Sequence, residues 1–284
     1  MFTGTTAIFS GESDLWDWLP LLVLAVSMII AYLNIIRLAH DQHSPTEPLA
    51  WARLAAFFSG LGIMLLCWIV PMDALGTAYL FTIHMSQHLL LSLIAAPLIL
   101  LGLPACCWQQ LLGQALHKRG FVLASNPFIA SAIFNGNIWI WHAPPLYQAM
   151  MLYPGLHFLA NLCYLLTGLL FWWPLLNPLE EGRMLRSLAS KLAYLFFSDM
   201  PMMLLGAGLT FSHPLYELSM SAMGSHGMAH MAQSSIMIEG SDQQLGGLLM
   251  WVAGNLFFIV IACSIGLHWL LQQERKEQEA EKAR

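Results

Sequence analysis

Charged side chains are scarce in this chain. Asp, Glu, Lys and Arg together make up 10% of its 284 residues, whereas a soluble domain carries about 25%. Hydrophobic residues reach 58%, and the mean hydropathy is +0.64. This balance excludes an ordinary soluble domain and predicts a protein that folds in lipid.

Other absences narrow the function. The five cysteines form neither a Cys-x-Cys nor a Cys-x-x-Cys pair, so we expect no disulfide framework and no thiolate metal clip. The net charge is −5, and no basic stretch stands outside the expected inner loops, so we expect no nucleic-acid partner. Neither a nucleophile–base arrangement nor a phosphate-binding glycine loop occurs, and the sequence therefore predicts a protein that is not an enzyme.

Long apolar runs dominate what is present. A helix that crosses a bilayer needs roughly 20 predominantly apolar residues. Seven segments meet this description, the fourth being the shortest: about 16–36, 50–70, 79–103, 127–142, 155–176, 190–210 and 246–271. We therefore predict an all-α fold, a polytopic membrane helical bundle with seven transmembrane helices in one integral-membrane domain, residues 1–284.

The basic residues predict the orientation of this bundle. All of them fall on one side of the seven spans: Arg37, Arg53, Lys118, Arg119, Arg183, Arg186, Lys191, Arg275, Lys276, Lys282 and Arg284. Because cytoplasmic loops retain positive charge, the N-terminus is expected outside and the C-terminus in the cytoplasm. Residues 211–245 then form an outer loop rich in Met and His, and residues 272–284 form a cytoplasmic tail. The first residues lack the basic region of a cleaved signal peptide, so the first span is expected to be an uncleaved anchor.

Histidines gather on the expected outer side. Seven of the eleven lie there: His84, His88, His142, His157, His213, His226 and His230. His84 and His88 are four residues apart and share one helix face. Ionisable side chains inside a membrane usually face the bundle interior and mark function, and neutral imidazole suits copper, zinc and iron. Two rings that simply hydrogen-bond to neighbouring helices remain the alternative.

Two further histidines lie at the same depth as this pair. His142 closes the fourth span and His157 opens the fifth, and the short proline-rich turn between them would bring the two rings together. Each alone could be an interfacial residue of the aromatic belt. Four imidazoles in one layer instead predict a metal site formed by His84, His88, His142 and His157.

The outer loop supplies auxiliary candidates. It carries five methionines, among them Met228 and Met231, beside His213, His226 and His230. Thioether sulfur favours Cu(I), and imidazole accepts copper in both oxidation states. The loop could therefore collect copper, or it could be a flexible segment whose methionines contact the membrane surface.

Two acidic residues complete the candidate set. Asp199 lies deep in the sixth span beside Pro201, where a kinked helix leaves carbonyl groups in need of partners, and it could serve structure, protons or metal. Asp242 precedes the seventh span, and could cap that helix or orient a metal-bound imidazole. The glycine pair in "DQQLGGLLMW" predicts a close helix–helix approach.

Four motifs together resemble a known family. "HMSQHLLLSLIAAPLILLGLP", "WIWHAPPLYQAMM", "LLTGLLFWWPLL" and "DQQLGGLLMW" are similar to landmarks of the polytopic CtaG-type (caa3-type) cytochrome c oxidase assembly factors of bacteria, over roughly residues 60–270. The resemblance implies a multi-pass protein of the bacterial inner (plasma) membrane that is needed to make an active haem–copper oxidase. By position, the family's motif histidines fall on His84, His88, His142 and His157, and its acid on Asp242.

The chain departs from the family pattern at three positions. Ala160 and Asn161 stand where the family commonly has a Glu-His pair, and Gln148 stands where an acid is common. If the missing groups complete a metal site elsewhere in the family, this chain must complete its own from the Met/His loop or bind more weakly.

These observations favour an assembly factor that binds copper at the outer membrane face and helps to deliver it to an oxidase subunit. The oxidation state of the copper is left open. The expected partners are cytochrome c oxidase subunits, a periplasmic copper chaperone and membrane lipid. A copper or proton-coupled transporter is the alternative, with Asp199 as its best inward polar group. A membrane cytochrome with two histidines on haem ranks third, because the resemblance does not point to haem.

Overall fold

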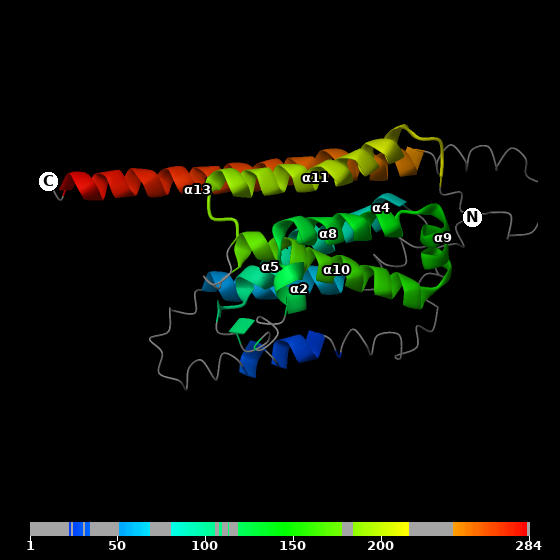
Figure 1. Ribbon diagram of the computed structural model, residues 1–284. Coiled ribbons are helices and arrows are strands. Elements are labelled where there is room, and N and C mark those ends of the chain that lie inside the picture. The colour runs from blue at the N-terminus through cyan, green and yellow to red at the C-terminus, as the bar shows by residue number, and fades with distance from the viewer. Residues whose placement is uncertain are drawn as a thin grey trace, which may run out of the picture. The chain divides into compact units, whose positions relative to one another are not determined.

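The computed structural model describes residues 23, 25–30, 32–34, 51–68, 81–105, 108–109, 113, 119–177, 184–215 and 241–282. These residues are helical apart from short turns and connections, and none of them forms a strand (Figure 1). The all-α prediction is confirmed for this part of the chain. The chain divides into two compact units, Met1–Ala50 and Trp51–Arg284. The described part of the first unit belongs to one apolar helix, Ala25–Asn34.

Five described helices are long and apolar enough to cross a membrane. They correspond to the predicted spans two, three, five, six and seven: Trp51–Trp68, Phe81–Gly102, Gly155–Leu176, Leu188–Phe211 and Ser241–Lys282. The fourth predicted span is helix α8, Pro127–Trp141, whose 15 residues extend over about 22 Å. A hydrocarbon core is about 30 Å thick. The count of seven spans and the orientation of the termini therefore stay predictions.

The second unit is a bundle of packed helices. Its elements in chain order are α2 (Trp51–Trp68), α4 (Phe81–Leu89), η1 (Leu90–Ala95), α5 (Ala96–Gly102), α7 (Arg119–Ala124), α8 (Pro127–Trp141), α9 (Pro144–Leu152), α10 (Pro154–Leu176), α11 (Leu188–Phe211), η4 (Leu249–Ala253) and α13 (Gly254–Lys282). Helix α10 packs against α8 and α5, α2 packs against α5, and α11 lies along α13 (Figure 1). Helices α4, η1 and α5 are one continuous rod.

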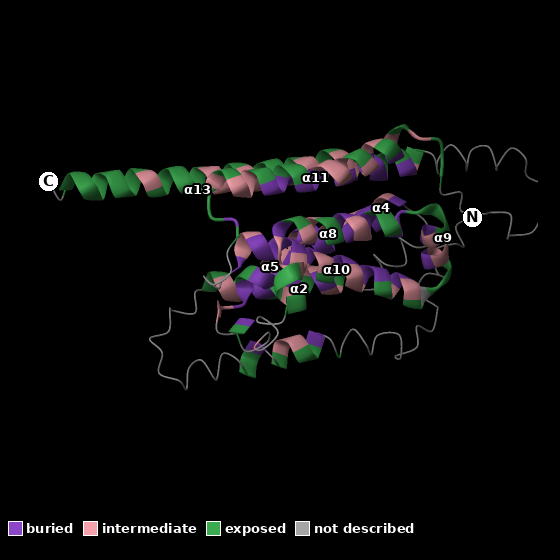
Figure 2. Ribbon diagram, in the orientation of Figure 1, coloured by how far each residue is buried: buried purple, intermediate pink, exposed green. Residues whose placement is uncertain are grey.

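Apolar side chains cover much of the surface of this unit, and polar side chains lie in its interior. Large hydrophobic side chains such as Phe197, Leu204 and Leu256 are 58–70% exposed, whereas twelve polar or charged residues are buried, including four histidines. Figure 2 shows the exposed residues on the outward sides of the helices and along the end of α13. This inverted pattern suits helices that face lipid and keep their polar groups within the bundle.

Glycines bring α11 and the last helix into close contact. A Cβ atom on Gly206 would lie 2.7 Å from the backbone nitrogen of Trp251, and one on Gly247 would lie 2.7 Å from that of Thr210. Backbones approach this closely only where one partner has no side chain. The close helix approach expected from the glycine pair is therefore confirmed.

Two of the rods contain a π-helical turn, η1 in the third predicted span and η4 in the last. A π-turn accommodates an extra residue within a helix and often occurs at functional sites. The last helix also begins earlier than predicted. It is helical from Ser241, inside the predicted loop 211–245, because Asp242 and Gln243 are anchored to neighbouring helices. At its other end it continues to Lys282, so the predicted tail 272–284 is helical as far as it is described.

Candidate metal centre

Three helices bring the four predicted histidines together at one end of the bundle. His84 and His88 come from α4, His142 is the C-cap residue of α8, and His157 lies in the first turn of α10. Helix α9 connects α8 to α10, so the ends that carry His142 and His157 are adjacent. All four side chains are buried, with exposed fractions between 0 and 4%.

The imidazole rings contact one another. Nε2 of His157 lies 3.3 Å from Nδ1 of His84, and the His84 and His88 ring centroids are 4.1 Å apart. The centroids of His88 and His142 are 6.0 Å apart. The four residues form one cluster, which we call the histidine cluster. Their rings face one another. Rings that pointed away from one another would have argued against a shared ligand.

His142 is held in one tautomer. Its Nδ1 lies 2.7 Å from the backbone oxygen of Ile138, so Nδ1 carries the proton and donates it to that carbonyl. The Nε2 atom then presents its lone pair, and it lies 3.1 Å from the sulfur of Met85. A metal-binding histidine usually has this arrangement, with its outer N–H fixed by a carbonyl or carboxylate.

Several nitrogens of the cluster have no hydrogen-bond partner among the described residues. They are Nδ1 and Nε2 of His88 and Nε2 of His84. The His88 ring stacks on Tyr164 with centroids 3.8 Å apart and an interplanar angle of 21°. Most buried polar atoms in proteins are satisfied, and an unsatisfied one costs about 1–3 kcal/mol. Each of these two rings therefore has at least one nitrogen that could contact a ligand, although a neutral His88 ring offers one lone pair only.

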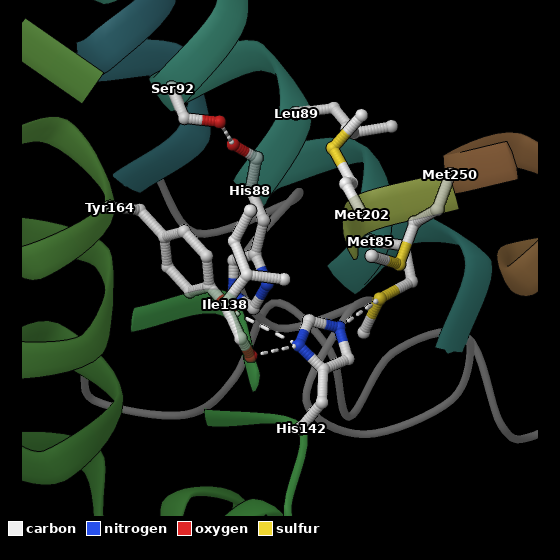
Figure 3. Close-up of a pocket in the computed structure, with 9 residues that line it drawn as sticks. All are labelled: Met85, His88, Leu89, Ser92, Ile138, His142, Tyr164, Met202 and Met250. Carbon is white, nitrogen blue, oxygen red and sulfur yellow. Dashed lines mark hydrogen bonds between the residues drawn. The ribbon is translucent and has the colours of Figure 1, made fainter. Parts of the chain in front are cut away.

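A small cavity of about 10 Å³ adjoins the cluster (Figure 3). Its volume suits a single water molecule or ion. Six of the side chains that line it carry an imidazole, a phenol or a thioether: Met85, His88, His142, Tyr164, Met202 and Met250. Within the described ranges, no group of three or more His, Cys, Asp and Glu side chains could hold a metal ion by itself. A metal site here would therefore need further donors, and the methionine sulfurs that line the cavity are candidates.

The sequence reasoning missed the contribution of Met85 and Met250. One signal was present, because Met85 and His88 are three residues apart and share a helix face. Met250 lies in the π-turn η4, and nothing in its local sequence distinguishes it from an apolar packing residue.

Comparison with known proteins places the chain among its relatives. The family model of the cytochrome c oxidase caa3 assembly factors (Caa3_CtaG) matches residues 30–272. The chain belongs to this family.

Curated relatives share this similarity. An uncharacterised protein of Mycobacterium leprae (strain TN) is 22% identical over 273 residues, which cover 89% of this chain and 38% of the relative. Uncharacterised proteins of Mycobacterium bovis and Mycobacterium tuberculosis are each 23% identical over 244 residues, covering 78% of this chain and 35% of the relative. The chain thus spans less than two fifths of the length of these relatives. No solved structure matches it.

The three departures from the family pattern differ in their surroundings. Ala160 and Asn161 are buried, with exposed fractions of 0 and 1%. Asn161 lies one helical turn after His157 on the same face, and its side-chain oxygen has no partner among the described residues. Gln148 is exposed on α9. The substitutions in α10 therefore border the histidine cluster, whereas the one at Gln148 points to the surface.

Asp242 anchors the helix that carries His84 and His88. Its carboxylate accepts hydrogen bonds from the backbone N–H of Phe81, from the backbone N–H of Thr82 at 3.2 Å and from the Thr82 hydroxyl at 2.6 Å. The two roles considered from sequence were a cap on its own helix and a partner of an imidazole. Asp242 instead caps α4, where a negative charge stabilises the helix N-terminus.

Asp199 is 7% exposed, and its Oδ1 has no partner among the described residues. It does not line the cavity. Two side chains of α8 donate hydrogen bonds to backbone carbonyls near Pro201. The Asn135 side chain donates to the Ser198 carbonyl at 3.0 Å, and the Trp139 indole donates to the Pro201 carbonyl at 3.2 Å. These contacts satisfy backbone oxygens around the proline, as an interrupted helix requires.

The outer-loop candidates remain largely untested. His213 is exposed, and its backbone oxygen accepts a hydrogen bond from Gln243 at 3.3 Å. His226, Met228, His230 and Met231 lie outside the described residues.

Proposed function

We propose that this assembly factor binds copper in the histidine cluster and delivers it to a subunit of a haem–copper oxidase. One observation carries the proposal: four buried imidazoles from three helices converge, and three of their nitrogens have no hydrogen-bond partner among the described residues. Imidazole is a good copper ligand. The family description supplies the context, because an oxidase is the enzyme whose assembly is served.

This set of ligands suits a copper ion that is bound and then released, rather than one that is held permanently. The cluster contains neutral nitrogen donors and thioether sulfurs, and neither a thiolate nor a carboxylate lines the cavity. Such a site holds a soft cation without an opposing charge. A donor with this ligand set can therefore release copper to an acceptor whose ligands are anionic.

Helix direction supports a position of the cluster in the outer half of the membrane. Arg53 lies at the start of α2 and Lys191 at the start of α11, each at the helix end away from the cluster. Arg275 lies near the end of α13, which runs away from the cluster. Because positive residues mark the cytoplasmic side, the cluster opens toward the outer face of the inner membrane. A periplasmic copper chaperone could supply it there, and an oxidase subunit could unload it.

The experiment measures copper bound to the full chain, purified in detergent and loaded with excess copper. The His84→Gln/His88→Gln double variant is expected to lose most of the bound copper, and cells that carry it are expected to lose oxidase activity. His268→Gln is the matched control, because His268 is exposed and bonded only to Gln272 of its own helix. Unchanged copper content together with unchanged oxidase activity in the double variant would refute the proposal.

A copper transporter is the second candidate function. Asp199 lies about one helical turn, ~4.5 Å, from the cavity residue Met202 toward the other end of α11. Its Oδ1 and that of Asn135 are buried, and neither has a partner in the described part of the chain. Copper uptake into sealed vesicles that is lost in Asp199→Asn would favour transport over delivery. An absorption spectrum without a Soret band is expected in either case, since neither function requires haem.

A further inference from the structure

The two contacts of the His142 ring would need two N–H groups, and a neutral imidazole has only one. The Ile138 carbonyl and the Met85 thioether are both hydrogen-bond acceptors, and they lie 2.7 and 3.1 Å from the two nitrogens of the same ring. A neutral imidazole carries one N–H, so it can donate to only one of them. The shorter contact to the stronger acceptor takes the proton, and the Nε2 lone pair faces the sulfur lone pairs. A bound cation would turn this acceptor–acceptor contact into two metal–ligand bonds.

Sulfur surrounds the same space. Met85 of α4, Met202 of α11 and Met250 of η4 line the cavity, each from a different helix. In Figure 3 the side chains of Met85 and Met250 converge on the same side of the His142 ring. Soft thioether ligands favour Cu(I), whereas Cu(II) suits nitrogen and oxygen donors. The wall of the cavity therefore has the chemistry of a Cu(I) site.

His88 provides an independent indication that a ligand belongs here. It is 4% exposed and lines the cavity, and neither ring nitrogen has a hydrogen-bond partner among the described residues. Its position is set by the stack on Tyr164. Both π-turns also border the cavity, through Ser92 of η1 and Met250 of η4. Each π-turn shifts the register of its helix and so determines which side chains reach this space.

We propose that this cavity is a Cu(I) site in which Met85 and His142 are the primary ligands, with Met250, Met202 and His88 available to complete the coordination. This inference rests on the proposed function and specifies it further: the assembly factor carries copper in the reduced state, on its methionine side. The His84–His157 pair then acts beside the site rather than within it.

The test titrates the full chain in detergent with Cu(I) held by a competing chelator, and in parallel with Cu(II). Met85→Leu and Met250→Leu remove sulfur while nearly conserving volume. Loss of an outer-sphere partner alone costs 10–100-fold in metal affinity. We therefore expect Met85→Leu to weaken Cu(I) binding about 100-fold and Met250→Leu about tenfold, with little change in Cu(II) binding.

Met203→Leu is the matched control. Met203 follows Met202 in α11, contacts Asn255 and does not line the cavity, so its Cu(I) affinity should equal that of the unmodified chain. X-ray absorption of the Cu(I)-loaded unmodified chain gives a second measurement that depends on no variant. We expect sulfur neighbours around copper, and we expect them to be lost in the Met85→Leu/Met250→Leu double variant.

The outcomes separate the two proposals. Copper that binds through nitrogen and oxygen neighbours alone, with unchanged affinity in both methionine variants, overturns the Cu(I) site and leaves the histidine-cluster proposal standing. An unmodified chain that binds no copper in either oxidation state overturns both. Sulfur neighbours together with weakened Cu(I) binding in the leucine variants would establish the site.

Discussion

The two sides of the histidine cluster differ in how their polar atoms are satisfied. On one side, His84 and His157 contact each other through ring nitrogens 3.3 Å apart, so one N–H can serve one lone pair, and Tyr147 packs edge-on against His84. On the other side, His142 faces the sulfur of Met85 beside a cavity. Each side contains two histidines: His84 and His157 on the first, and His88 and His142 on the second. The cavity and its methionine sulfurs distinguish the side that can accept a cation.

The largest expected effect compares one histidine from each side. His142→Gln should weaken Cu(I) binding about 100-fold, because it removes a proposed ligand, whereas His157→Gln should cost about tenfold, at the low end of the effect of outer-sphere partners. Competitive Cu(I) titration of the two variants measures the ratio. Equal losses in both variants would show that copper binds across the whole cluster, and the distinction between its two sides would then be wrong.

A smaller effect is expected where α4 is anchored. Asp242→Ala removes the carboxylate that accepts three hydrogen bonds at the start of α4. Loss of a helix N-cap typically costs about 1 kcal/mol, and we expect a loss of about 1–2 kcal/mol in the free energy of unfolding. Thermal unfolding in detergent, followed by circular dichroism, measures the loss.

Copper binding separates anchoring from coordination at Asp242. Asp242→Asn keeps one acceptor oxygen and should recover part of the lost stability, and Cu(I) affinity should fall only severalfold in either variant. A loss of copper as large as that in His142→Gln, with thermal unfolding unchanged, would make Asp242 a ligand and not an anchor.

The smallest expected effect is an increase in copper affinity. Asn161→His places a second imidazole on the face of α10 that carries His157, at a buried position whose present amide oxygen has no partner in the described ranges. We expect copper to bind about threefold to tenfold more tightly, which corresponds to about 1 kcal/mol. The dissociation rate of loaded copper measures this. Gln148→Glu is the control, because Gln148 is exposed; an equal gain there would point to a nonspecific charge effect.

The fold was predictable in its repeated features. Apolar runs of about 20 residues identified five helices that are long enough to cross a membrane, because hydropathy over such a window reflects the solvent that surrounds the helix. The fourth predicted span was less well defined, since α8 has only 15 residues and its neighbours bury much of it. The boundary of the last helix was wrong by several residues, because its first turn is held by contacts with α4 and α11 rather than by its own composition.

The site was predictable only in part. The i, i+4 spacing of His84 and His88 and the short connection between His142 and His157 depend on local geometry, and the four rings do meet. Met85 and Met250 were missed because methionine in an apolar run is indistinguishable from a packing residue. Their sulfurs gain significance only beside the lone pair of His142, which belongs to another helix.

The sequence alone determined the all-helical class, the long apolar helices and the shared helix face of His84 and His88, because hydropathy and helical spacing act over one or two turns. Only the tertiary structure decided that Asp242 caps α4 and that three methionines from three helices line one cavity. It also decided that the His142 ring lies between two acceptors, only one of which can receive its proton. These features depend on contacts between residues far apart in the chain, such as the 161 positions between Phe81 and Asp242, and no local pattern encodes which distant partner a side chain will meet.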